Sequence, residues 1–91
     1  MTSTKTTTMM IPTIHMNGTS KDALMDELST ANSALLDAIH ALASCAPNGR
    51  DYYPQGPTAI TTALDEHKSR LERITSVRHE IVLLMGAVED S

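Results

Sequence analysis

The chain has 91 residues, a formal net charge of −4 and one cysteine, Cys45. One cysteine excludes an intrachain disulfide and is typical of a reducing compartment. The acidic balance argues against a protein that follows a duplex nucleic-acid backbone, because each phosphate contact needs a cation. No apolar run is long enough to span a bilayer or to form a signal peptide, so we expect a cytoplasmic protein that does not enter a membrane.

The first segment is polar and then β-branched. Residues 1–10 are rich in threonine and predict a disordered tail ahead of a single domain, residues 11–91. In residues 11–16, Ile14 alternates with polar neighbours and Pro12 favours extended backbone, which predicts a short strand or an extended arm. Because one isolated strand is not stable, this arm must lie against the helices or pair with the same arm of another subunit.

A first helix is predicted over residues 20–46. Asn17 and Gly18 break the arm, Thr19 or Ser20 can cap the helix, and Thr19 with Asp22 resembles a capping box. Apolar residues follow at alternating spacings of four and three: Leu24, Leu28, Ala31, Leu35, Ala38, Leu42 and Cys45. A second apolar line runs beside them: Met25, Leu36, Ile39, Ala43 and Ala46. The apolar arc is therefore wider than one partner helix can cover.

A turn region with three prolines, residues 47–57, separates this helix from a second one, predicted over residues 58–85. Its apolar seam consists of Ile60, Leu64, His67, Leu71, Ile74, Arg78, Ile81, Met85 and Val88. Two seam positions are polar, His67 and Arg78, and polar seam residues often set register or partner number. Gly86 is expected to weaken the final turn, and the last residues to fray.

These elements predict an all-α fold: an antiparallel two-helix hairpin with a short extended N-terminal arm. Two helices alone rarely form a stable domain, and both carry apolar stripes that are too broad for one neighbour. We therefore expect hairpins to assemble into an oligomeric helical bundle, at least a dimer.

The sequence offers weak signals for catalysis or metal binding. Cys45 lies among alanines on the seam, where a thiol packs as a small apolar group, and His40 is on a different face. Asp37 and His40 have a ligand-like spacing, but the second helix offers no matching pair, so solvated surface residues are the favoured interpretation. We expect a protein that is not an enzyme and has no cofactor or metal.

Two stretches could bind a small anion. Thr19, Ser20 and Lys21 combine free amides at a helix start with hydroxyls and an ammonium group, although a helix cap alone explains them as well. Arg50 offers a guanidinium group, and two tyrosines beside it, Tyr52 and Tyr53, offer rings for stacking on a base. The alternative is that the tyrosines close the end of the hairpin while Asp51 pairs with Arg50.

The second helix carries further cations. Arg70 and Arg73, with the seam residues His67 and Arg78, could form a local basic groove for a small anion. Glu66 and Arg70 have the spacing of a favourable ion pair within a helix.

The two candidate stretches lie at opposite ends of a helix about 39 Å long, so they cannot share a ligand within one subunit. Antiparallel packing of two hairpins would bring the helix start of one chain beside the loop of the other. A composite site between subunits then becomes possible.

The order of these features, with "PTIHMNGTS", then "APNGRDYYPQG" and "EHKSRL", resembles small proteins encoded by phages and prophages. In size and layout the chain is also similar to the phage anti-defence sponges of the anti-CBASS 2 and Thoeris anti-defence 1 families. Those oligomers sequester cyclic-nucleotide or cyclic ADP-ribose immune signals without cleaving them. The resemblance implies an anti-defence role in the cytoplasm of a bacterial host, with no site residue carried over.

The leading hypothesis is a non-enzymatic homo-oligomer that sequesters a small phosphorylated nucleotide-type signal. The rival hypothesis is a structural or partner-binding helical adaptor of phage or bacterial origin, whose apolar stripe docks another protein.

Overall fold

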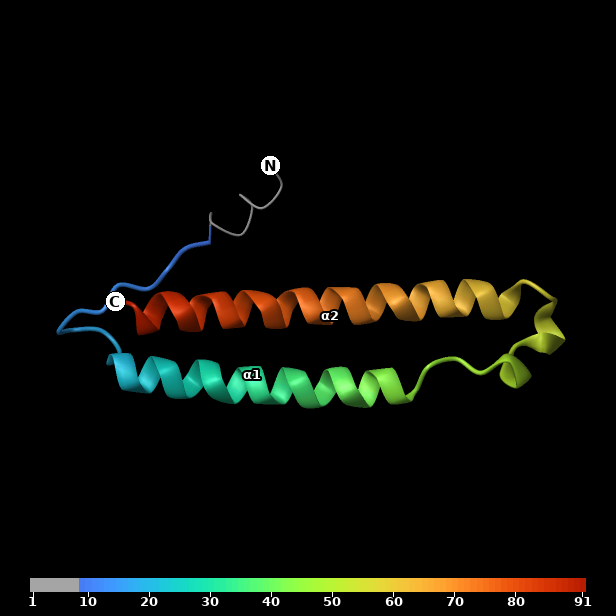
Figure 1. Cartoon of the computed structure of the whole chain (residues 1–91), viewed down its shortest axis with the longest axis horizontal. Coiled ribbons are helices and arrows are strands. Elements are labelled where there is room, and N and C mark those ends of the chain that lie inside the picture. Colours follow the sequence, from blue (N-terminus) through green and yellow to red (C-terminus); the bar gives the residue numbers. More distant parts are fainter. Residues whose placement is uncertain (1–8) are drawn as a thin grey trace.

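The computed structural model describes residues 9–91, which contain two long helices and no strand. Figure 1 shows α1 (Lys21–Ser44), then two short 3-10 helices, η2 (Gly49–Asp51) and η3 (Tyr53–Gln55), and finally α2 (Ala59–Glu89). The predicted all-helical class is confirmed. Residues 11–15 are irregular, so the strand alternative for the arm is wrong. The predicted disordered tail lies outside the described residues except for Met9 and Met10.

α1 begins directly after its cap. The Ser20 hydroxyl accepts a hydrogen bond from the Ala23 amide at 3.1 Å, so Ser20 and not Thr19 is the N-cap. The predicted capping box of Thr19 and Asp22 is wrong, since Ala23 occupies the third helical position and has no side chain that could return the bond. The helix ends at Ser44, two residues earlier than predicted, where the Cys45 amide bonds back to the Leu42 carbonyl oxygen at 3.2 Å.

α2 is longer than predicted. It continues through Gly86 to Glu89, because Val88 in its last turn is fully buried and the burial offsets the cost of a helical glycine. The ammonium group of Lys21 donates to the Ser91 carbonyl oxygen at 3.1 Å, which ties the end of α2 to the start of α1. The predicted end of this helix at residue 85 is therefore wrong, whereas the weakening by Gly86 and the fraying of the last residues stay predictions.

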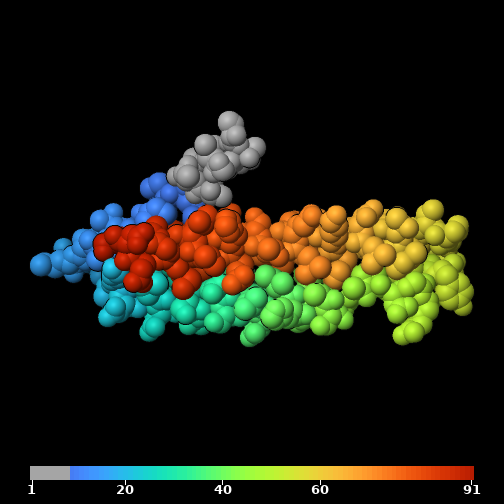
Figure 2. Space-filling model, viewed as in Figure 1, coloured from blue at the N-terminus to red at the C-terminus, as the bar shows by residue number. Residues whose placement is uncertain are grey.

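α2 lies beside α1 and continues past its end, next to the loop, while the start of α1 lies beside the end of α2 at the other end of the molecule (Figure 1). The molecule measures 61 × 30 × 16 Å along its principal axes. Figure 2 shows the same elongated body, with α2 against α1. A single pair of helices can bury only the line along which the two helices meet.

The described part of the chain has little interior. Its buried residues are Ala63, His67 and Val88, all on α2, and α1 has none. The apolar residues of α1 are half-buried at best: Ala23, Leu24, Met25, Leu28, Ala31, Leu35, Leu36, Ile39 and Leu42. The predicted seam is wrong at three positions, since Ala63 is buried where Leu64 was expected and Ala38 and Cys45 are exposed. The helix contact on α1 is centred nearer to Ile39 than to Ala38.

A polar contact sets the register of the two helices. The Arg78 guanidinium donates through Nε to the Asn32 side-chain oxygen at 2.9 Å, in a part-buried position. Because this bond joins the two helices at one level, it fixes which residues of α1 and α2 face each other. Arg78 was predicted as a polar seam residue, and Asn32 is its partner on the other helix.

Truncation of Val88 should destabilise the fold. Replacing Val88 by alanine removes two buried methyl groups, and we expect a loss of about 2 kcal/mol in the free energy of unfolding. Val77 is 48% exposed, so the matched Val77→Ala change should cost less than about 0.5 kcal/mol. Chemical denaturation followed by circular dichroism, at one fixed chain concentration, measures both. Equal losses for the two variants would contradict the burial of Val88.

Loss of the Asn32 side chain should leave the Arg78 guanidinium part-buried without its acceptor. We expect Asn32→Ala to lower the free energy of unfolding by about 1.5–3 kcal/mol, the range for a hydrogen bond to a charged group. Ser33→Ala, at the exposed neighbouring position, is the control. In a double-mutant cycle, Arg78→Met combined with Asn32→Ala should cost less than the sum of the two single changes. Strict additivity would mean that the bond does not contribute.

Candidate functional site

The loop end of the molecule holds a small cavity. Two successive 3-10 turns fold the loop, with the Asn48 side-chain oxygen accepting from the Arg50 amide at 3.0 Å and the Tyr52 amide bonding to the Gly49 carbonyl oxygen at 3.0 Å. Gly56, at a φ of 115°, then redirects the chain into α2. The result is a cavity of about 320 Å³ whose lining is Tyr52, Gln55, Thr58, Ala59, Thr62, Ala63 and Glu66.

The two tyrosines have different environments. Tyr52 is half-buried and forms part of the cavity wall, whereas the side chain of Tyr53 is 73% exposed. Arg50 is exposed one turn earlier, and within residues 9–91 its guanidinium forms no ion pair with Asp51. The predicted trio of Arg50, Tyr52 and Tyr53 is therefore together on two adjacent turns. In the alternative, the ion pair of Asp51 with Arg50 is wrong, whereas closure of the hairpin end by the tyrosines stays a prediction.

The other predicted stretch is at the far end of α1. Ser20 caps the helix, Lys21 bonds to Ser91, and Thr19 is exposed. The helix between this end and the loop has 24 residues, so the two stretches are separated by about 36 Å. The cap explanation accounts for Ser20, and a contact at the chain end accounts for Lys21.

The predicted basic groove on α2 is not formed. His67 is buried and Arg78 is bonded to Asn32, so both are taken up in the contact between the helices. Arg70 pairs with Glu66 at 3.9 Å, as its spacing predicted, and both side chains are at least half exposed. Arg73 donates through Nε to the carbonyl and hydroxyl oxygens of Ser69, each at 3.3 Å. Neither arginine is part of the loop site.

Sequence reasoning missed the residues that complete the cavity, namely Gln55, Thr58, Thr62 and Glu66. Thr58, Thr62 and Glu66 recur every four residues and so share one face at the start of α2. That spacing could have indicated a shared surface at the start of α2. The position of Tyr52 beside this surface depends on the two 3-10 turns of the loop.

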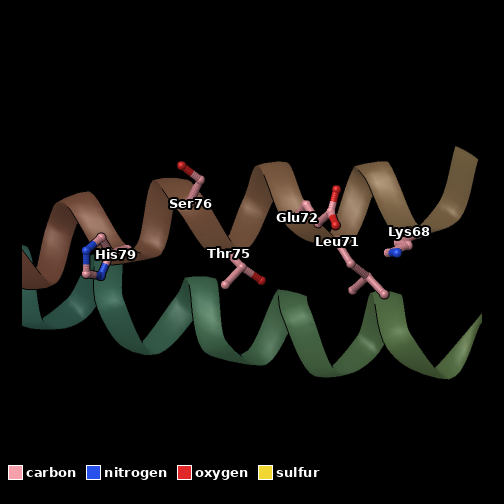
Figure 3. Close-up of a pocket in the computed structure, with 6 residues that line it drawn as sticks. All are labelled: Lys68, Leu71, Glu72, Thr75, Ser76 and His79. Atoms are coloured by element: carbon pink, nitrogen blue, oxygen red, sulfur yellow. The ribbon is translucent and has the colours of Figure 1, made fainter. Parts of the chain in front are cut away.

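A second hollow follows the middle of α2. It has a volume of about 540 Å³, and its surface is mostly apolar. Figure 3 shows its lining, with Leu71 and Thr75 extending toward α1 and Ser76 pointing away from it. The residues have spacings of three and four: Lys68, Leu71, Glu72, Thr75, Ser76 and His79. We call this the α2 groove.

Two further properties of residues 9–91 bear on other functions. No three side chains among His, Cys, Asp and Glu come together in a metal-binding arrangement there. Neither of the helices described is long and apolar enough to cross a membrane.

Comparison of the chain with family models, with curated proteins and with solved structures gave no match.

One buried polar atom lacks a partner in the described structure, the Nε2 of His67. We expect His67→Leu to raise the free energy of unfolding by about 1–3 kcal/mol, because it removes an unsatisfied buried group. The control is His40→Leu, at an exposed position of α1, which should change stability by less than about 0.5 kcal/mol. Urea denaturation at fixed chain concentration measures both. Destabilisation by His67→Leu alone would show that the imidazole has a stabilising partner.

Proposed function

We propose that the protein is a non-enzymatic homo-oligomer that binds and sequesters a small phosphorylated nucleotide-type ligand, of the cyclic nucleotide or cyclic ADP-ribose class. One observation carries the proposal. Tyr53 and Arg50 are exposed on the turns that also place Tyr52 in the wall of a cavity. A stacking surface, a cation and a small hollow are the three features that such a ligand requires.

The chemistry of the lining suggests how the ligand is oriented. The lining residues of the cavity include no lysine or arginine, and Glu66 is already paired with Arg70, so the lining offers no cation for a phosphate. The hydroxyls of Thr58 and Thr62 suit a ribose or the edge of a base. The phosphate then lies outside, near Arg50, and the base stacks on the exposed ring of Tyr53. The cavity of about 320 Å³ is at the small end of the range for ligand pockets, and it suits part of a nucleotide.

Assembly is part of the same proposal. An antiparallel hairpin whose first helix has no buried residue supports an oligomeric bundle as the functional form. In such a bundle, Thr19, Ser20 and Lys21 of one chain could complete the phosphate site beside the loop of another.

The biological role follows from the ligand class. A binder that holds an immune signal without cleaving it would lower the free signal concentration in the bacterial cytoplasm. The resemblance to phage anti-defence sponges supports this role.

Isothermal titration with cyclic nucleotides and cyclic ADP-ribose isomers tests the proposal. Tyr53→Ala should weaken binding by about 5- to 150-fold, since stacking on one aromatic ring contributes about 1–3 kcal/mol. Arg50→Gln should weaken binding by about tenfold or more, through the loss of a charge-assisted hydrogen bond. Arg73→Gln removes the same charge from α2 and is the matched control. Absence of binding at high micromolar ligand, or equal losses for all three variants, would refute the loop site.

A partner-binding helical adaptor is the second candidate, favoured by the half-exposed apolar residues of α1. Under this alternative Ala38→Glu, at an exposed position of α1, would abolish capture of the partner protein. Tyr53→Ala would leave that capture unchanged.

A further inference from the structure

The α2 groove continues beyond its six lining residues. Leu64 is 46% exposed and Val82 is 40% exposed, and both lie at helical spacings from Leu71 that place them on its side of α2. Leu64, Leu71 and Val82 therefore form an apolar strip along one side of α2, with polar residues beside and between them: Lys68, Glu72, Thr75, Ser76 and His79. We infer that this strip binds the same strip of a second copy of the chain, with the two α2 helices running in opposite directions.

The strip is nearly symmetric about its own centre. Leu64 and Val82 each lie nine residues from position 73, and the lining residues fall in pairs about the same region: Lys68 with His79, Leu71 with Ser76, and Glu72 with Thr75. A two-fold axis near residues 73 and 74 would place Leu64 against Val82 of the partner subunit at both ends of the contact. Self-complementarity of this kind is what an interface between identical chains requires.

Charge favours the inverted arrangement. With the two helices in opposite directions, Lys68 lies level with the partner's His79, and Glu72 lies level with the partner's Thr75. A parallel arrangement would instead stack Lys68 on Lys68 and Glu72 on Glu72 of the partner subunit. Like charges at such positions are destabilising.

The amount of surface fits a second copy. The whole chain exposes 6684 Å², and residues 1–8 account for at most about 1,200 Å² of this, the surface of an unfolded segment of their mass. A compact protein with the mass of residues 9–91 exposes about 4,800 Å², so these residues expose a surplus of at least about 700 Å². Each partner in a standard protein interface buries about 800 Å². The surplus is thus close to one subunit's share.

The same axis completes the proposed ligand site. It places the end of α2, at Val88, level with the partner's Ala59, where the loop cavity begins. Lys21 is bonded to the chain end beside Val88, so its ammonium group lies at the level of the partner's loop. This last step rests on the proposed function, whereas the inverted dimer itself does not.

Disulfide trapping without ligand tests the arrangement. In a Cys45→Ser background, Thr75→Cys should give a covalent dimer under mild oxidation, because the two thiols would be about three residues, or 4.5 Å, apart along the axis. Lys68→Cys alone should remain unlinked, since its copies would be about 16 Å apart along the axis. A mixture of the Lys68→Cys and His79→Cys chains should give the mixed dimer. Linking of Lys68→Cys to itself as readily as Thr75→Cys would overturn the inverted register.

A charge scan provides an independent measurement. Leu64→Glu and Val82→Glu should each weaken self-association at least tenfold in sedimentation equilibrium, while circular dichroism shows an intact helical fold. Val77→Glu is the matched control, because Val77 is 48% exposed but lies outside the groove. Equal weakening by all three changes, or an unmodified chain that sediments as a monomer, would overturn the interface. A dimer that binds no nucleotide would refute the ligand proposal and leave this interface standing.

Discussion

Two helices that lie side by side touch along one line, and the remaining faces of each helix stay open to solvent. In this chain the line of contact encloses only Ala63, His67 and Val88 among the residues described. Burial of apolar surface is the main stabilising contribution in folding. A pair of helices of this size buries little apolar surface and gains little stability from it. The wide apolar stripe of α1, the α2 groove and the exposed Leu64 and Val82 are consequences of the same shortage. The oligomer proposed above would cover these surfaces.

Polar residues within the contact then decide how the two helices align. A seam made only of leucine and alanine would tolerate sliding by one heptad, whereas the bond between Arg78 and Asn32 is made at one register only. His67 lies eleven residues before Arg78 on the same seam and is buried without a described partner for its Nε2. The contact between the helices thus contains a polar pair that specifies their alignment and a buried imidazole whose unsatisfied Nε2 lowers the stability of the fold.

The sequence was sufficient for the larger features, because helical periodicity, a capping serine and a run of prolines and glycines act locally. These features predicted two helices joined by a turn region, and the ion pair of Glu66 with Arg70. Sequence reasoning failed where contacts between residues far apart in the sequence determine the structure. Burial of Val88 extends α2 past Gly86, and the facing helix draws His67 and Arg78 inward, away from the predicted basic groove.

For the candidate site, the trio of Arg50, Tyr52 and Tyr53 could be recognised from composition. The cavity beside it depends on how two 3-10 turns fold back over the first turns of α2.

The placement of the tyrosines has a practical consequence. The chain contains no tryptophan and no phenylalanine, and its two tyrosines are adjacent. Its near-ultraviolet absorption and intrinsic fluorescence therefore come from the loop at one end of the molecule. Tyr52 is half-buried, and Tyr53 is exposed to solvent. The tyrosines are therefore a label-free optical probe of the loop end. Their signal responds to binding at that end and is largely insensitive to changes elsewhere in the chain.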